Sequence, residues 1–344
     1  MAEAVSPATF AAIAIAIGLA LLSAEPVRAQ TCTAVASNAC TEWIELAGPS
    51  QRALVYRSRP LMERAPTIER ALIVVHGGGR NADHMFRTAL GAAFLAGALD
   101  TTLVISPRFG SAQGPGCRDT VARGEISWAC GGWRWGSVAA STDAVTSFDL
   151  IDALVRRLTH KPDFPKLTSI VVAGFSMGGQ FVQRYAMANT VHEASGVRMS
   201  YVVGSPSSYA YPDASRLDPA DGTFGGYVDA LNCAAYNRWP FGFQDRVGYA
   251  AKSPDAQLRA QLTSRPVAYV LGGLDTTPDF GFDTTCPAMA QGPSRLARAQ
   301  VFTKLLAEKY SVQPRLLVVA ACGHSDRCVF TADETLPLLF PPRP

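Results

Sequence analysis

A serine flanked by glycines is the strongest chemical signal in this chain. The motif Gly174-Phe-Ser176-Met-Gly178 follows the apolar run 169–173 and precedes a helix-compatible stretch, 177–187. Glycines at these positions let a strand turn so sharply into a helix that the serine takes strained dihedral angles and exposes its hydroxyl. The motif therefore predicts a nucleophile elbow with Ser176 as the nucleophile.

A serine hydroxyl is a poor nucleophile until a base takes its proton, so the histidines come next. His84 stands beside an expected helix start, His160 at an expected helix end and His192 in a polar connector. Only His324 follows the last apolar run, 315–320, in a glycine-containing turn. That turn would lie at the carboxyl edge of the sheet, so we expect His324 to be the general base.

The carboxylate that orients the imidazole is expected between the serine and the histidine in chain order. The apolar run 267–271 leads into Gly272-Gly-Leu-Asp275, which would leave the sheet at the same edge. We therefore expect Asp275 to be the third member of a triad. Asp279 and Asp283 follow in the same loop and stay open as alternatives, their other use being turn formation or capping.

Two backbone N–H groups should stabilise the tetrahedral oxyanion. Met177 directly follows the nucleophile and supplies the first. The second should come from the loop His76-Gly-Gly-Gly79 after the apolar run 71–75, because glycines let the backbone approach the substrate. We favour Gly78 over Gly79, and we expect His76 to be structural, bonding loop carbonyls.

These turns require alternating strands and helices. Apolar runs of strand type lie at 71–75, 102–106, 169–173, 201–204, 267–271 and 315–320, and helix-compatible segments lie at 82–99, 143–158, 177–187 and 294–309. Continuous apolar strands are typical of a mostly parallel sheet with helices on both faces. Ser141 or Thr142 should cap the helix at 143, and residues 30–70 should contain a hairpin.

The loop 76–79, the serine motif, Asp275 and His324, each after a strand, resemble the α/β-hydrolase superfamily over about residues 71–330. Within it, segments 76–83 and 147–152 and Pro206-Ser-Ser-Tyr209 are similar to secreted esterases near polyhydroxyalkanoate depolymerases and feruloyl esterases. The resemblance implies an α/β-hydrolase fold and the mechanism of a serine hydrolase. It departs from the short-lid depolymerases in the long segment 206–264, which we expect to be a lid after strand six.

Aromatic residues crowd this insertion and the glycine-rich stretch 107–140. They could line a substrate-binding wall, or they could pack the insertion onto the body, and the sequence leaves both interpretations open. The candidate substrate-binding residues are Trp135, Tyr209 and Trp239.

The amino-terminal region and the cysteines bear on the compartment. Residues 10–22 form an apolar run before Val27-Arg-Ala29, so we interpret 1–29 as a signal peptide and 30–344 as one domain; an uncleaved anchor is the alternative. All eight cysteines follow residue 29, which is typical of disulfides in an exported protein, periplasmic or extracellular. Proximity favours the pairs 32–40, 117–130, 233–286 and 322–328 among 105 possible pairings.

Charge and ligand spacing exclude several classes of protein. The formal net charge is +3, and no block of five like charges occurs, which is unlike a nucleic-acid-binding protein or a polybasic membrane anchor. No Cys-x-x-Cys or paired histidines occur at the spacing of zinc ligands. We therefore expect no nucleic acid, no metal and no stable membrane association after signal cleavage.

Together these features predict a secreted serine hydrolase that cleaves small or polymeric carboxylic esters through an acyl-enzyme, without a cofactor. The same residues could instead attack a peptide bond or a β-diketone of an oxidised synthetic polymer, since each reaction begins at a carbonyl carbon. A non-catalytic binding protein on this fold is the remaining alternative.

Overall fold

The computed structural model describes residues 1–2, 31–33, 37–278 and 281–342. Almost all of the expected signal peptide, 1–29, therefore lies outside the described residues. Among the residues that are described, none of the helices combines the length and the hydrophobicity that a membrane span requires.

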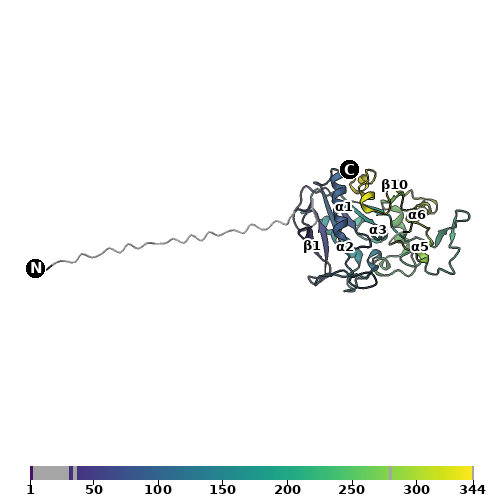
Figure 1. Ribbon diagram of the computed structural model, residues 1–344, viewed down its shortest axis with the longest axis horizontal. Coiled ribbons are helices and arrows are strands. Elements are labelled where there is room, and N and C mark those ends of the chain that lie inside the picture. Colours follow the sequence, from purple (N-terminus) through teal and green to yellow (C-terminus); the bar gives the residue numbers. More distant parts are fainter. Residues whose placement is uncertain (3–30, 34–36, 279–280, 343–344) are drawn as a thin grey trace.

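An eight-stranded sheet forms the centre of the molecule, in the order β1-β2-β4-β3-β5-β6-β9-β10 (Figure 1). Its strands are β1 (Thr41–Glu45), β2 (Arg52–Arg57), β3 (Arg70–Val75), β4 (Thr102–Pro107), β5 (Ser169–Phe175), β6 (Arg198–Gly204), β9 (Val267–Gly272) and β10 (Arg315–Val319). The pairs from β4 to β10 are parallel, while β1 with β2 and β2 with β4 are antiparallel. The expected mostly parallel sheet and the amino-terminal hairpin are confirmed.

Helices cover both faces of this sheet. The α-helices are α1 (Ala82–Leu95), α2 (Ser147–Leu158), α3 (Met177–Ala188), α4 (Asp255–Ser264), α5 (Cys286–Met289), α6 (Arg295–Tyr310), α7 (Asp326–Phe330) and α8 (Leu336–Leu339). Alternate strand residues enter two separate apolar clusters: Leu72 packs with α1, α7 and α8, and Ile73 packs with α2, α3 and α6. Figure 1 shows the yellow carboxyl-terminal helices beside α1.

Two helix boundaries differ from the sequence-based expectation. Helix α2 begins at Ser147 rather than at 143, because Thr146 forms the cap: its N–H and its hydroxyl both donate to Asp149 Oδ2 at 2.7 Å. Neither Ser141 nor Thr142 caps this helix. Helix α1 ends at Leu95 rather than near 99, because Gly97 adopts a left-handed conformation (φ 60°) that stops the helix.

Four disulfide bonds join Cys32 to Cys40, Cys117 to Cys130, Cys233 to Cys286 and Cys322 to Cys328. These are the four pairs that proximity in the sequence favours, and no cysteine is left free. The pairing is consistent with the expected exported protein.

The segment 206–264 contains little regular structure. It holds the small hairpin of β7 (Ser215–Leu217) and β8 (Phe224–Gly226), which projects from the body in Figure 1, and then α4. The disulfide from Cys233 to Cys286 ties it to the first residue of α5. Its role as a lid remains a prediction.

Candidate active site

Ser176 lies at the turn from β5 into α3 with φ 58° and ψ −117°, a conformation that residues other than glycine rarely adopt. Its N–H donates to Gly204 O at 2.9 Å, which holds the turn against the neighbouring strand. A Cβ on Gly174 would lie 2.3 Å from Gly178 O, and one on Gly178 would lie 2.2 Å from Val75 O. The two glycines are therefore required by close backbone packing, as in the expected elbow geometry.

His324 and Asp275 are brought together by two adjacent parallel strands. His324 Nδ1 lies 2.8 Å from Asp275 Oδ2, and their side chains are 14% and 1% exposed. The loops after β9 and β10 interlock, since Leu274 N donates to Cys322 O at 2.9 Å. Gly272 permits this contact, because a Cβ there would lie 2.3 Å from Cys322 O.

The environment keeps Asp275 ionised. Burial by itself raises its pKa, but the hydrogen bond and charge of His324 and the charge of Arg295 lower it, and the net pKa is below the ordinary value. Asp275 can therefore accept a hydrogen bond from His324 Nδ1–H and leave Nε2 free to act as a base. The alternative Asp283 instead accepts hydrogen bonds from Thr285, as a turn residue does. Asp279 lies outside the described residues.

The residue before Ser176 contacts the ring of His324. The ring of Phe175, the residue before the serine, lies 5.0 Å from the His324 ring, centroid to centroid. Within the described part of the chain, Ser176 Oγ makes no hydrogen bond to His324. Catalytic hydrogen bonds are often long in ligand-free enzymes and shorten in the substrate complex.

The glycine loop after β3 lies against the elbow. A Cβ on Gly78 would lie 3.0 Å from Met177 Sδ, and one on Gly77 would lie 3.6 Å from Ser176 Cβ. Gly79 is exposed, and the atoms nearest to a Cβ added there belong to Asn81. The loop thus lies with Gly77 beside Ser176 and with Gly78 beside the Met177 side chain, and its role as an oxyanion donor stays a prediction.

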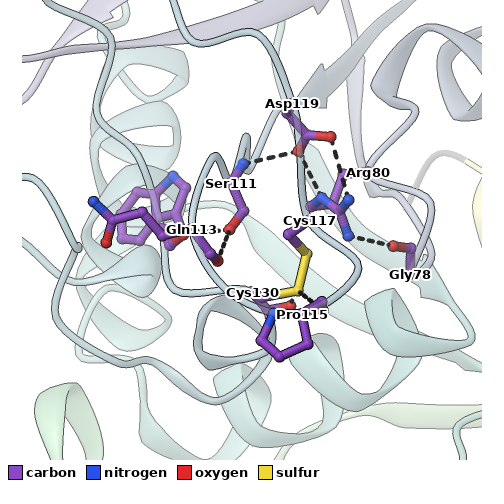
Figure 2. The surroundings of a disulfide bond; sticks show 9 residues. Gly78, Arg80, Ser111, Gln113, Pro115, Cys117, Asp119 and Cys130 are labelled. Atoms are coloured by element: carbon purple, nitrogen blue, oxygen red, sulfur yellow. Dashed lines mark hydrogen bonds and ion pairs between the residues drawn. A yellow bond between two sulfur atoms is a disulfide. The ribbon is translucent and has the colours of Figure 1, made fainter.

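Arg80 holds this loop in place, which the sequence analysis missed. Figure 2 shows it between the Gly78 carbonyl, 2.8 Å from Nη1, and the Asp119 carboxylate, 2.6 Å from Nε. Asp119 Oδ2 also accepts the Ser111 N–H at 2.8 Å, close to the disulfide of Cys117. Arg80 and Asp119 are 39 positions apart, so no local pattern links them.

His76 has the structural role expected of it. Its Nδ1 lies 2.9 Å from Gly77 O, and its Nε2 accepts the Phe109 N–H at 3.0 Å. The pKa of His76 is lowered to about 4, mainly by burial. The hydrogen bond to Gly77 O raises the pKa in part, and the charge of Arg80 lowers it. The ring is therefore a neutral strut that joins the glycine loop to the segment after β4.

Residues 72–336 match the model of the alpha/beta hydrolase family. The chain belongs to this family. No curated protein sequence matches the chain significantly.

Two solved structures share the fold of this hydrolase. Poly(aspartic acid) hydrolase-1 from Sphingomonas sp. KT-1 has a TM-score of 0.62 and 20% identity, over 87% of this chain and 97% of that one. A poly(3-hydroxybutyrate) depolymerase from Bordetella parapertussis has a TM-score of 0.60 and 20% identity, over 87% of this chain and 90% of that one.

The hydrolase has a cleft of about 660 Å³ beside the elbow. Met177 lines it together with Arg134, Trp135, Phe241 and Phe282, among other residues. The expected substrate-binding residue Trp135 therefore lies on the cleft wall, next to the residue that follows the nucleophile.

The other two aromatic candidates do not line this cleft. Trp239 is 9% exposed, and its Nε1 donates to Trp135 O at 3.2 Å, so it supports the wall from behind. Tyr209 is fully buried, with its ring 4.5 Å from that of Phe302 and its backbone paired with Gln291. This corrects the expectation for Tyr209, whose ring packs the insertion onto the body.

The remaining histidines have structural partners. His84 pairs with Asp326, and His160 pairs with Asp163 on the surface. His192 Nδ1 lies 3.0 Å from the hydroxyl of Tyr201. Across the described ranges, no group of three His, Cys, Asp or Glu side chains is arranged to hold a metal ion.

Proposed function

We propose that this protein is an exported serine hydrolase that cleaves carboxylic esters, small or polymeric, through an acyl-enzyme. The observation that carries the proposal is the 2.8 Å contact between His324 Nδ1 and the buried Asp275 carboxylate, beside the strained elbow of Ser176. An ionised carboxylate fixes the histidine tautomer that can take a proton from a serine.

In the proposed reaction, Ser176 Oγ attacks the ester carbonyl carbon while His324 Nε2 takes its proton. The N–H groups of Met177 and Gly78 bind the oxyanion, and Gly79 is the alternative second donor. His324 then gives the proton to the leaving alcohol, which leaves an acyl group on Ser176. A water molecule, deprotonated by His324, hydrolyses that ester and restores the serine. Asp275 stays ionised throughout, and the scheme uses no metal or organic cofactor.

The comparisons and the disulfides support this proposal. One structural neighbour is named for an ester polymer, poly(3-hydroxybutyrate). Four disulfides favour an oxidising compartment, which is the periplasm or the medium outside the cell. The proposal includes substrate contact by Trp135, a lid over the site from residues 206–264, and a cleaved signal peptide at 1–29.

The test is hydrolysis of p-nitrophenyl esters by the purified, oxidised protein and by Ser176→Ala and Asp275→Asn. We expect Ser176→Ala to abolish turnover and labelling by a fluorophosphonate, and Asp275→Asn to lower kcat on the order of a thousandfold or more. Asp221→Asn is the matched control, because Asp221 is exposed and its carboxylate only accepts hydrogen bonds from Thr223 in a turn of the insertion. Undiminished turnover by Ser176→Ala would refute the proposal.

Amide hydrolysis is a second candidate, because the other structural neighbour is named a poly(aspartic acid) hydrolase. A panel of matched acyl esters, aminoacyl amides and β-diketones separates the possibilities. We expect the highest kcat/KM on esters, and a higher value on amides would assign the same residues to amide-bond cleavage.

A further inference from the structure

Arg134 occupies the wall of the cleft that Met177 also lines. It belongs to a short 3-10 helix, Gly132–Trp135, which packs against α3. Its guanidinium carbon lies 4.6 Å from the centroid of the Trp135 ring, a cation–π contact that fixes the orientation of the group. A cationic side chain is therefore held at the side of the proposed acyl-transfer site.

Within the described part of the chain, the Arg134 guanidinium has no polar partner. Among the described residues it donates no hydrogen bond and forms no ion pair, and its buried Nε is unsatisfied. Leaving a buried charged donor without an acceptor is costly, so such groups are nearly always satisfied by protein, water or ligand. The N–H donors on Nη1 and Nη2 of Arg134 are thus available to a ligand in the cleft that this side chain lines.

The neighbouring buried arginine makes a clear contrast. Arg184 donates to Pro240 O, Gln180 O and both oxygens of Ser208. Its role is to hold the insertion onto α3. Arg134 donates no such hydrogen bond to any residue that the structure describes, so a structural role does not account for its charge.

The electrostatics of the cleft favour an anion. Burial lowers the pKa of Arg134, and the negative charge of Asp283 raises it in part. Asp283 makes no ion pair with Arg134, however, and accepts a hydrogen bond from the Thr285 N–H instead. The pKa of Arg184 is lowered to about 9, first by burial of its side chain and then by the nearby positive charge of Arg134. Arg134 and Asp283 are the charged residues that line the cleft, and the buried Arg184 nearby adds a second positive charge, which favours an anion in the cleft.

We propose that Arg134 binds a carboxylate of the substrate at a position remote from the scissile bond. This inference rests on the proposed function and names its substrate class: esters that also carry a free carboxylate, such as hydroxy-acid oligomers with a free acid end or half-esters of diacids. The planar fork of arginine matches the two oxygens of a carboxylate.

The experiment compares esters that differ only in this charge. One pair places the carboxylate on the acyl side, mono-p-nitrophenyl glutarate and its methyl ester. The other places it on the alcohol side, the linear dimer of 3-hydroxybutyrate and its methyl ester. We expect the wild-type protein to prefer the free acid in at least one pair. Arg134→Gln should lower kcat/KM about tenfold to a hundredfold for that acid only, as the loss of a charge-assisted hydrogen bond implies.

Two further variants control for net charge. Arg315→Gln removes the same charge at the amino end of β10, the sheet edge opposite His324, and should leave the acid-to-methyl-ester ratio unchanged. Asp283→Asn removes the opposing charge and should raise the ratio. Equal losses on acid and methyl ester in Arg134→Gln, or no preference in either pair, would overturn the proposal.

Binding without turnover separates this inference from the proposed function. In the Ser176→Ala background, monomethyl glutarate or the linear dimer of 3-hydroxybutyrate should protect against thermal unfolding more than its own methyl ester does, and Arg134→Gln should remove the difference. If the free acid and the methyl ester protect the Ser176→Ala protein equally, Arg134 does not bind a carboxylate, whatever the outcome of the esterase assay. If the difference is present and no ester is hydrolysed, the binding role stands and the proposed function fails.

Discussion

Arg295 Nη1 lies 3.2 Å from Asp275 Oδ1, and both side chains are almost completely buried. The carboxylate is thus held from two sides, because its other oxygen faces His324 Nδ1. Arg295 Nε also donates to Ser207 Oγ at 3.1 Å, which fixes the guanidinium between α6 and the loop after β6. Arg295 is therefore a positioning residue for the proposed triad.

Replacing Arg295 by Met should impair both folding and turnover. A buried carboxylate that loses its charged partner typically costs about 3–5 kcal/mol in the free energy of unfolding. We expect kcat on p-nitrophenyl esters to fall at least about tenfold while KM changes little, because Asp275 would hold the imidazole less firmly. Urea unfolding and steady-state kinetics well below the melting temperature measure the two effects. Arg295→Lys should have a higher kcat than Arg295→Met, because it keeps a positive charge beside Asp275. If the role of Arg295 is purely structural, kcat in the two variants should follow only their free energies of unfolding.

Replacing Arg80 by Gln should release the glycine loop. Its contacts with Gly78 O and Asp119 hold the loop that supplies the proposed second oxyanion donor. Loss of one oxyanion donor costs about a hundredfold or more in kcat, so a misplaced donor should cost on the order of tenfold. Arg87→Gln removes an exposed arginine paired with Asp83 on α1 and should leave kcat unchanged. Equal kcat values for the two variants would contradict this role.

A methyl group on Gly178 should prevent the elbow from forming. It would lie 2.2 Å from Val75 O and 2.6 Å from His76 O, and neither backbone carbonyl can move without breaking the sheet edge. We expect Gly178→Ala to give little soluble folded protein. Gly91→Ala is the contrasting substitution: Gly91 lies within α1 with nothing within 4 Å of an added Cβ, and the change should raise the free energy of unfolding by about 0.5–1 kcal/mol. Circular dichroism and melting temperatures test both.

The neutral His76 makes stability depend on pH. Burial lowers its pKa from 6.5 to about 4, so between these values the unfolded chain binds a proton that the folded protein does not. The free energy of unfolding should therefore decrease as pH falls from about 6.5 to about 4, with a contribution from His76 of up to about 1.4 kcal/mol per pH unit. Denaturant unfolding at several pH values measures the slope, and His76→Gln should make it shallower. An unchanged slope would show that His76 does not titrate in this way.

Local sequence was sufficient for the features that depend on neighbouring residues. The strands were recognisable because they are continuous apolar runs, and the elbow because two glycines must flank a strained serine. His324 and Asp275 followed from strand ends, since parallel strands end at one sheet edge. The start of α2 was misplaced because Ser141 and Thr142 are as suitable for capping as Thr146. In the structure Thr146 pairs with Val138 and bonds to Asp149, and the helix begins after it.

The sequence by itself determined the order of strands and helices, the elbow and the residues at the ends of the strands, because backbone sterics and hydrophobic periodicity act over a few neighbouring residues. Tertiary structure decided that Arg80 reaches Asp119, that Tyr209 faces the core and that Arg134 faces the cleft without a partner. These facts depend on side-chain directions between segments that are far apart in the chain. Packing sets those directions, and no local pattern of residues records them.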